Sequence, residues 1–249
     1  MHVLFVNYAD WQGPSGIHVF HLANALLDYG VLATVLVPNT PERVSIFGYP
    51  RFRTLSYQDA LQNIPRESPD LIHAWTPRES TRWVTQKLVR KLGVPYVVHL
   101  EDCEDSVLHR YLDAPSFMQK WWRLMRLNLL QRYMPLPHPV RYKSFLANAT
   151  GVTMIMDSLR DILPSSRATE VFWPGCEEEV FSMPLQPDAA LREKLGLKPD
   201  ESVLVWAGNV HALNAEDMRD LYCAVRIVRQ QGKSFSVVRI GSDLVNWKQ

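Results

Sequence analysis

The sequence has few cysteines, no long apolar run and almost no net charge. Its three cysteines, Cys103, Cys176 and Cys223, lie far apart and form no Cys-x-x-Cys pair, which argues against a disulfide framework or a zinc site. The formal net charge is +1, so overall charge gives no attraction to nucleic acid. No apolar run approaches the roughly 20 residues of a membrane span, and the N-terminus lacks the pattern of a signal peptide. We therefore expect a protein of the reducing cytoplasm.

Short apolar runs alternate with amphipathic helical patterns. The runs predict a short strand near Thr54 and longer strands at 3–6, 32–37, 69–75, 96–100 and 152–156. Helical spacing follows at 17–29, near 57–63 and at 79–92. This alternation predicts an α/β fold whose parallel sheet is covered by helices on both faces. Ligands bind beyond the carboxyl ends of such strands, so residues directly after strands are the first candidates for a site.

A proline-rich and acidic stretch over residues 173–202 predicts a domain boundary, with one short helix at 188–195. A second strand–helix–strand unit is predicted to follow at 203–209, 215–231 and 235–240. The part after the boundary is about half of an ordinary domain, and two strands alone leave an unburied face. We expect an N-terminal Rossmann-like domain over residues 1–180 and the incomplete first part of a second Rossmann-like domain over residues 181–249.

The first predicted strand is followed by a loop that reads Gly13-Pro-Ser-Gly16 and opens a helix. Its glycines would let backbone N–H groups approach a ligand closely, and a helix N-terminus favours an anion or a hydroxyl-rich group. The pattern is neither Gly-x-Gly-x-x-Gly nor a P-loop, which weakens dinucleotide binding and ATP hydrolysis. An ordinary tight turn is an equally good interpretation of this loop taken alone.

Seven stretches of the chain form an ordered set: GPSG, ALLDYGVLATVLVP, PDLIHAWTPRE, LGVPYVVHLED, VTMIMDSLRDIL, VFWPGCEEEVF and VLVWAGNVHALN. Together they resemble glycosyltransferase family four and cover nearly the whole chain. The resemblance implies a GT-B fold, in which two Rossmann-like domains face each other. It also implies transfer of a sugar from a nucleotide-sugar donor with retention at the anomeric carbon, without a metal or another cofactor. The N-terminal domain would bind the acceptor and the C-terminal domain the donor.

The same resemblance assigns roles to individual residues. His99 would be the catalytic histidine, which hydrogen-bonds a sugar hydroxyl and stabilises the developing positive ring without acting as a nucleophile. The donor would contact the two glycine loops, through Gly13, Ser15, Gly16, Gly208 and Asn209.

Two departures from the family pattern concern the donor half. The family places an Arg and a Lys after the second glycine loop, where this chain reads GNVHALNAEDM, so Arg239 is the substitute candidate for the donor phosphates. The family's Glu-x7-Glu element has spacing matches at Glu170/Glu178 and Glu193/Glu201, but both precede the second sheet and are interpreted as coincidence. We therefore expect that this chain cannot turn over alone.

Four residues at predicted strand ends are candidates for acceptor binding: His73, Thr76, Glu101 and Asp102. Each also has a structural interpretation. A histidine within a strand is more often a hydrogen-bonded structural residue, Thr76 precedes an ordinary helix start, and the two acids could form a solvated loop or a helix N-cap. No fourth ligand accompanies His99 and the two acids, so no metal site is expected. His18 and His21 are interpreted as surface or packing residues.

Residues 107–146 are unusually basic and aromatic, with seven Lys or Arg residues against one acid, Asp113. A basic amphipathic helix with tryptophans suits an anionic membrane surface. The candidates that would face the membrane are Lys120, Trp121, Trp122, Arg123 and Arg126. The alternative is a cleft-side insertion with buried Trp and Leu side chains and solvated basic groups. No nucleic-acid motif accompanies the charge, so no nucleic-acid partner is expected.

These patterns lead to one hypothesis and two alternatives. The first is a retaining glycosyltransferase acting on a sugar, glycolipid or small glycoside, located in the cytoplasm and peripheral to the inner membrane face. One alternative is a nucleotide-sugar epimerase of the same architecture, whose site would hold more acidic and basic groups. The other is a non-catalytic fragment that binds glycans or a partner protein.

Overall fold

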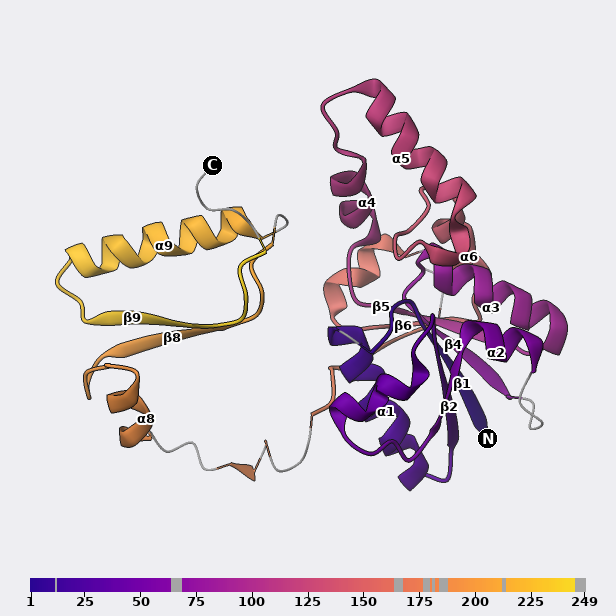
Figure 1. Cartoon of the computed structure of the whole chain (residues 1–249), viewed down its shortest axis with the longest axis horizontal. Coiled ribbons are helices and arrows are strands. Elements are labelled where there is room, and N and C mark those ends of the chain that lie inside the picture. The colour runs from indigo at the N-terminus through magenta and orange to yellow at the C-terminus, as the bar shows by residue number, and fades with distance from the viewer. Residues whose placement is uncertain are drawn as a thin grey trace. The chain divides into compact units, whose positions relative to one another are not determined.

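The computed structural model describes residues 1–11, 13–63, 69–163, 168–176, 180, 182–183, 188–211 and 214–244. The chain divides into two compact units, residues 1–181 and 182–249 (Figure 1). The first unit contains one parallel sheet with helices around it, and the second contains a smaller strand–helix–strand arrangement.

The first unit is built on a seven-stranded sheet in which all neighbouring strands are parallel. The strand order is β3-β2-β1-β4-β5-β6-β7. The strands are β1 (His2–Asn7), β2 (Leu32–Val37), β3 (Arg53–Ser56), β4 (Leu71–Trp75), β5 (Tyr96–Leu100), β6 (Gly151–Met154) and β7 (Thr169–Val171). The order reverses between β1 and β4, which is the position where doubly wound sheets bind ligands beyond their carboxyl ends.

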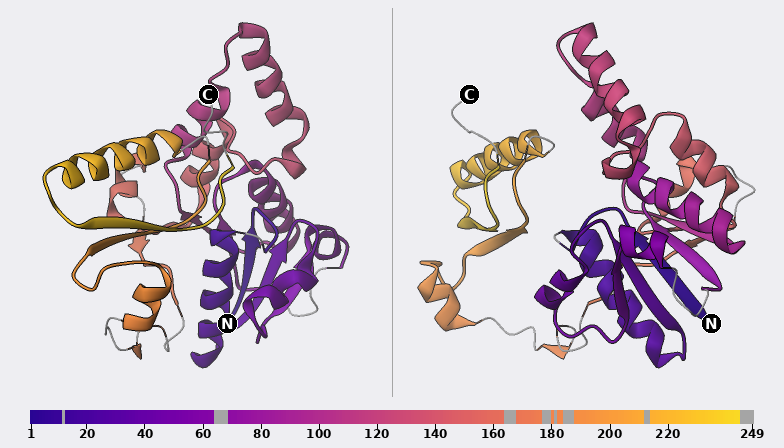
Figure 2. Two further views of the ribbon diagram at one scale, coloured as in Figure 1. Left: turned by 60° about the vertical axis from the view of Figure 1, so that its left-hand side comes forward. Right: turned by 45° about the vertical axis from the view of Figure 1, so that its right-hand side comes forward.

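Alternate residues of β1 pack on opposite faces of this sheet. Leu4 and Val6 belong to a buried cluster that also holds side chains of three helices, α2 (Tyr57–Gln62), α3 (Glu79–Leu92) and α6 (Arg141–Asn148). Val3 and Phe5 belong to a second cluster, which includes buried side chains of α1 (Pro14–Asp28). Both faces are therefore covered, as the continuous apolar strands predict, and Figure 2 shows helices on either side of the sheet.

The remaining helical elements of the first unit are 3₁₀ turns and two longer helices. The turns are η1 (Pro41–Phe47), η2 (Gln131–Tyr133) and η3 (Asp157–Ile162). The helices α4 (Glu104–Leu112) and α5 (Phe117–Leu129) follow β5 and form a pair that extends beyond the sheet (Figures 1 and 2). The Tyr96 ring of β5 stacks on Phe145 of α6 with 4.9 Å between centroids.

Most of the predicted elements are confirmed, and β2, α3 and β5 have the predicted bounds. One strand was missed, and the basic segment divides into several elements. Within 107–146, Pro115 and the prolines at 135, 137 and 139 separate α5 from its neighbours. Strand β7 was not expected, since its three residues are partly exposed and too few to show a period.

The second unit contains α8 (Ala189–Lys194), β8 (Ser202–Ala207), α9 (Ala215–Gln230) and β9 (Phe235–Ile240). The two strands are parallel and are joined through α9. Its buried cluster is small and consists of Val210, Ala215 and Met218 with Trp206 and Leu221 beside them. Large apolar side chains of both strands are exposed, with Val205 at 60% and Ile240 at 62%. The described part of this unit thus buries little apolar surface.

Gly16 provides a test of how tightly α1 is seated. A Cβ built on Gly16 would lie 3.0 Å from the Trp11 carbonyl oxygen, which is backbone and cannot move aside cheaply. We predict that Gly16→Ala destabilises the first unit by about 1–3 kcal/mol through overpacking. Chemical unfolding followed by circular dichroism measures this. Ile17→Ala, at the exposed neighbouring position, is the control, and equal stability of the two variants would contradict the prediction.

Candidate functional site

A cavity of about 220 Å³ lies at the carboxyl edge of the sheet, within the first unit. Its walls come from α1, from the ends of β4 and β5 and from the segment after β7, and include His18, His21, Trp75, His99, Phe172 and Cys176. The cavity therefore lies beside the reversal of strand order, where the fold predicts a ligand.

His99 is held rigidly in the wall of this cavity. Its ring stacks on Trp75, with 3.9 Å between centroids, and on Phe172, with 4.9 Å, and these two rings also contact each other at 6.2 Å. Its Nδ1 lies 2.8 Å from the Thr153 hydroxyl oxygen. Because Nδ1 is engaged, Nε2 is the ring nitrogen left for a ligand. The predicted catalytic histidine thus lines a cavity, with its ring orientation fixed from three sides.

Thr153 also contacts His73, whose Nε2 lies 3.0 Å from the same hydroxyl oxygen. The hydroxyl can donate only one proton, so at most one imidazole accepts from it and at least one donates to it. Burial lowers the pKa of His73 to about 3. Burial also lowers the pKa of His99 to about 2, with smaller contributions from His73 and His18. Both rings are therefore neutral at physiological pH.

His73 does not line the cavity, although it was a candidate for acceptor binding. It is buried within the sheet and packs against Phe5 and Trp75, with ring centroids 5.3 Å from each. This environment favours the structural interpretation, in which His73 supports His99 through Thr153.

Glu101, directly after β5, is the centre of a hydrogen-bond network. Its carboxylate accepts hydrogen bonds from the Ser15 hydroxyl and from the Trp75 indole, the latter at 2.9 Å. His18 Nδ1 lies 2.8 Å from the same carboxylate. Burial alone raises the pKa of Glu101, but the hydrogen bonds from His18, Ser15 and Trp75 outweigh it and leave the pKa below its usual value. Glu101 orients His18 rather than His99.

Asp102 turns away from this network. It pairs with the Arg78 guanidinium at 2.6 Å, and Arg78 also lies 3.4 Å from the buried carboxylate of Glu104. Burial raises the pKa of Glu104 to about 7, against the opposing effect of Arg78. The N-cap of α4 is Cys103, so the N-cap interpretation of the two acids was wrong.

Thr76 is fully buried just after β4. Its φ of 56° lies in the left-handed region, which is costly for a β-branched residue. Its hydroxyl has no hydrogen-bond partner among the described residues. Backbone strain of this kind concentrates at functional sites, so the role of Thr76 in acceptor binding stays a prediction.

Some groups of the first glycine loop already make contacts within the protein. Gly13 has a φ of 125° and precedes Pro14, the first residue of α1. Gly16 packs against the Trp11 backbone, so its missing side chain serves this contact. The Ser15 hydroxyl is bonded to Glu101. Donor binding by these three residues stays a prediction, and it would use their backbone N–H groups.

The predicted donor residues of the second unit lie at the carboxyl ends of β8 and β9. Gly208 follows β8 and donates its N–H to the Ile240 carbonyl at 2.8 Å. The Asn209 side chain accepts from the Ser242 N–H at 2.8 Å. Arg239 pairs with Asp243 at 2.6 Å. The side chains of Asn209 and Arg239 thus have structural partners, and both contacts lie near the carboxyl ends of β8 and β9.

Sequence reasoning missed His18 and His21, which it interpreted as surface or packing residues. Both line the cavity, and His18 contacts Glu101. Their spacing of three residues does place them on one face of a helix. What could have identified them is that this helix opens directly after β1, so its first turns lie at the same edge as the residues that follow β5.

Within the part of the chain that the structure describes, no three His, Cys, Asp or Glu side chains group in a way that could hold a metal ion. None of the described helices combines the length and the apolar character needed to span a bilayer.

No protein-family model matches the sequence, and no curated protein matches it. Solved GT-B glycosyltransferase structures do match the fold. HepE of Anabaena, in complex with UDP and glucose, is 12% identical with a TM-score of 0.54, over 96% of this chain and 69% of that one. The protein has a GT-B-like fold. Arabidopsis thaliana UGT89C1, complexed with quercetin, is 14% identical with a TM-score of 0.52, over the same shares of the two chains. The predicted fold class is thereby confirmed.

The two buried histidines predict how stability depends on pH. In the unfolded chain they take up protons below about pH 6.5, whereas the folded state keeps them neutral. Stability is thus fully present above that pH and falls by about 1.4 kcal/mol per pH unit for each histidine as acid is added. We predict that His73→Gln, which retains a nitrogen near the Nε2 position, roughly halves this slope between about pH 6 and pH 4.

Urea unfolding at a series of pH values measures the slope. His109→Gln, on the exposed side of α4, is the matched control and should leave the slope unchanged. An unaltered slope in His73→Gln would show that the acid sensitivity arises elsewhere.

Proposed function

We propose that the protein is a glycosyltransferase that moves a sugar from a nucleotide-sugar donor to a hydroxyl group of a sugar, glycolipid or small glycoside. The GT-B-like fold supports this proposal. So do the molecules bound in the two matched structures: UDP and glucose in HepE, and quercetin, a hydroxylated small molecule, in UGT89C1. These three correspond in chemistry to the leaving nucleotide, the transferred sugar and an acceptor.

The observation that carries the proposal is the cavity around His99. Its wall presents a neutral imidazole, fixed through Nδ1 and packed against two neighbouring aromatic rings. The half-buried Phe172 ring can pack against the C–H groups of a sugar, and the free imidazole nitrogen can hydrogen-bond a hydroxyl. A polar wall without a formal charge at His99 suits a neutral, hydroxyl-rich group rather than an ion.

We assign His99 a hydrogen bond to the transferring sugar, which stabilises the positive charge that develops on the sugar ring. Transfer breaks the bond between the anomeric carbon and the donor phosphate and forms a bond to the acceptor oxygen. A neutral imidazole with a depressed pKa is a poor proton donor, so its contribution is electrostatic. The resemblance to family four implies retention at the anomeric carbon and a metal-free reaction, and both are part of the proposal.

We also propose that donor binding needs more chain than the second unit provides. The described part of that unit has two strands and a small core. Arg239, the candidate for the donor phosphates, is already paired with Asp243. Gly208 and Asn209 remain the proposed contacts to the donor at the end of β8, although the Gly208 N–H already donates to the Ile240 carbonyl.

The proposal predicts sugar transfer with retention. This chain, and the longer product of the same reading frame if one exists, should be incubated with UDP-glucose and other nucleotide sugars, with and without glycoside acceptors. Proton NMR of the first product gives its anomeric configuration. If only the longer protein transfers sugar, and the first product keeps the anomeric configuration of the donor, the result supports both the proposal and the need for more chain.

Each other outcome of this experiment contradicts a part of the proposal. Interconversion of the nucleotide sugar would indicate an epimerase, and glycan binding without transfer would indicate a non-catalytic protein. Inversion would exclude retention and would implicate His18, because an imidazole oriented by a carboxylate is the arrangement of a general base.

His99→Asn tests the catalytic assignment. Asparagine retains a polar atom close to the Nδ1 position, so the contact with Thr153 survives, but it lacks Nε2. We predict that turnover falls by about 100-fold while donor affinity changes little, since the lost interaction strengthens only in the transition state. Steady-state kinetics on the shortest version that transfers sugar measures both quantities. His109→Asn is the control, and wild-type turnover in His99→Asn would remove His99 from the mechanism.

A further inference from the structure

Helix α5 presents its apolar face to solvent instead of to the protein. Its large apolar side chains are strongly exposed, with Phe117 at 84%, Met118 at 68%, Trp121 at 47%, Trp122 at 57% and Leu129 at 71%. This excludes the alternative in which the tryptophans of the segment are buried. A contiguous exposed apolar surface of this kind marks an interaction site.

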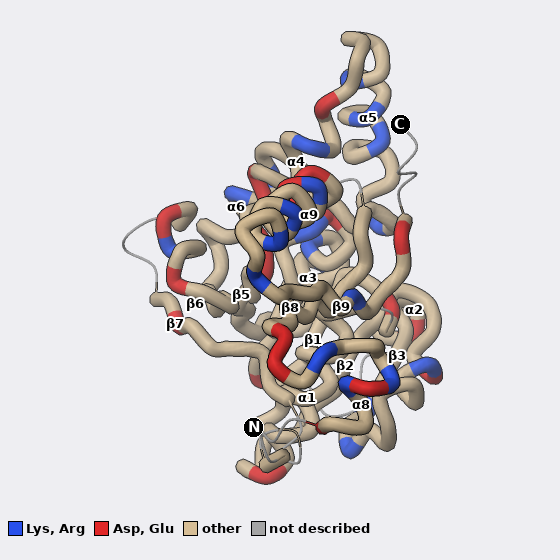
Figure 3. Tube along the Cα trace, turned by 90° about the vertical axis from the view of Figure 1, so that its left-hand side faces the viewer, with Lys and Arg blue, Asp and Glu red and all other residues tan. Residues whose placement is uncertain are grey.

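The exposed side chains form one stripe along the helix. At 3.6 residues per turn, positions 117, 118, 121, 122 and 129 fall within an arc of about 140°. Lys120 lies about 60° beyond one end of this arc and Arg126 about 40° beyond the other. Neither cation has a side-chain partner among the described residues. Figure 3 shows basic positions along α5.

The opposite side of α5 attaches the helix to the protein and fixes its rotation. Leu127 is fully buried in a cluster with Leu108 and Met134. Arg123 was expected to face a membrane, but its guanidinium donates to the carbonyls of Tyr111 and Asp113 at 2.6 and 2.8 Å. These contacts satisfy Arg123 internally and hold the apolar stripe outward.

The helix pair α4–α5 starts at the edge of the sheet that carries the cavity. Chain order requires this, because α4 begins at Glu104, three residues after Glu101 and directly beyond the carboxyl end of β5. The pair extends past the rest of the first unit in every ribbon view (Figures 1 and 2). A flat surface could therefore contact α5 without meeting the sheet.

We propose that α5 docks the first unit onto an anionic bilayer surface. The stripe of Phe117, Trp121 and Trp122 would enter the interface between headgroups and acyl chains, where tryptophan is favoured. Lys120 and Arg126 would reach lipid phosphates from either side of it. The proposal is independent of the transfer reaction, since it concerns a surface and not the cavity.

Charge favours a bilayer over a second copy of this chain. The segment 107–146 holds seven basic residues and one acid. Two α5 stripes packed face to face would bring Lys120 and Arg126 of both copies together with few acids to neutralise them. An anionic lipid surface supplies the missing negative charge without a specific acidic partner.

Vesicle sedimentation tests the proposal on the full chain. With vesicles of equal parts phosphatidylcholine and phosphatidylglycerol at low salt, we expect binding that weakens as salt is added. The double variant Lys120→Gln/Arg126→Gln should lower the partition coefficient by roughly 30-fold, from the usual effect of two interfacial cations. Trp121→Ser/Trp122→Ser should lower it by at least about tenfold, through lost apolar burial.

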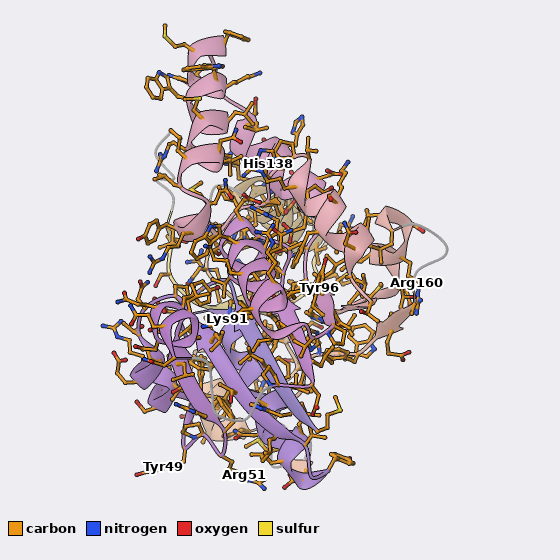
Figure 4. All side chains as sticks on the ribbon, turned by 90° about the vertical axis from the view of Figure 1, so that its right-hand side faces the viewer. Tyr49, Arg51, Lys91, Tyr96, His138 and Arg160 are labelled. Atoms are coloured by element: carbon orange, nitrogen blue, oxygen red, sulfur yellow. The ribbon has the colours of Figure 1, made fainter. Side chains whose placement is uncertain are left out.

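Matched variants elsewhere on the first unit serve as controls. Arg90→Gln/Lys91→Gln removes the same charge from α3, and Tyr49→Ser removes a ring that is 95% exposed at the end of the unit opposite α5 (Figure 4). These controls should bind as the wild type does. Absence of binding to anionic vesicles, or equal loss in control and α5 variants, would overturn the proposal. Self-association that the Trp variants abolish, without vesicle binding, would instead identify a dimer surface and overturn it too.

Discussion

The site depends on the carboxylate of Glu101. A buried carboxylate without a Lys or Arg partner is stable only if hydrogen-bond donors replace its hydration. Glu101 has Ser15 and His18 from α1 and Trp75 from β4 around it. It therefore ties the first turns of α1 to two neighbouring strand ends. Because the Trp75 indole is held by this bond, its face is fixed where His99 stacks on it.

A second constraint is that two imidazoles buried in the sheet hydrogen-bond to the same hydroxyl group. His73 and His99 share Thr153, and all three come from adjacent strands, β4, β5 and β6. Burial keeps the rings neutral, so the cavity wall is polar but uncharged at this point. The Phe5 ring packs against His73. The arrangement joins core stability to the site, because the same contacts that bury His73 also orient His99.

Several arginines of the first unit hold its elements together, whereas two cations of α5 have no such role. Arg78, Arg82 and Arg141 contact buried or partly buried acids on α3 and α4 and hold the helices against the carboxyl edge. Arg123 fixes α5 through backbone carbonyls. On α5, Lys120 and Arg126 have no side-chain partner among the described residues and lie at the borders of the apolar stripe. Most of the basic residues in segment 107–146 thus contact other groups of the protein. The exposed surface of α5 is aromatic as much as it is basic.

The sequence by itself determined the α/β fold, since short, mostly apolar runs such as 32–37 and 96–100 alternate with helical patterns, which indicates a parallel sheet covered on both faces. It also placed His99 and Glu101 at the correct edge, because strand ends are local features. Only the tertiary structure decided which of these residues meet. His18 and Glu101 are far apart in sequence, and nothing in the spacing of His18 and His21 distinguishes a cavity wall from a surface. The same holds for the partners of Arg123 and Arg239. Periodicity reports burial along one element, whereas a hydrogen bond between elements depends on how they pack.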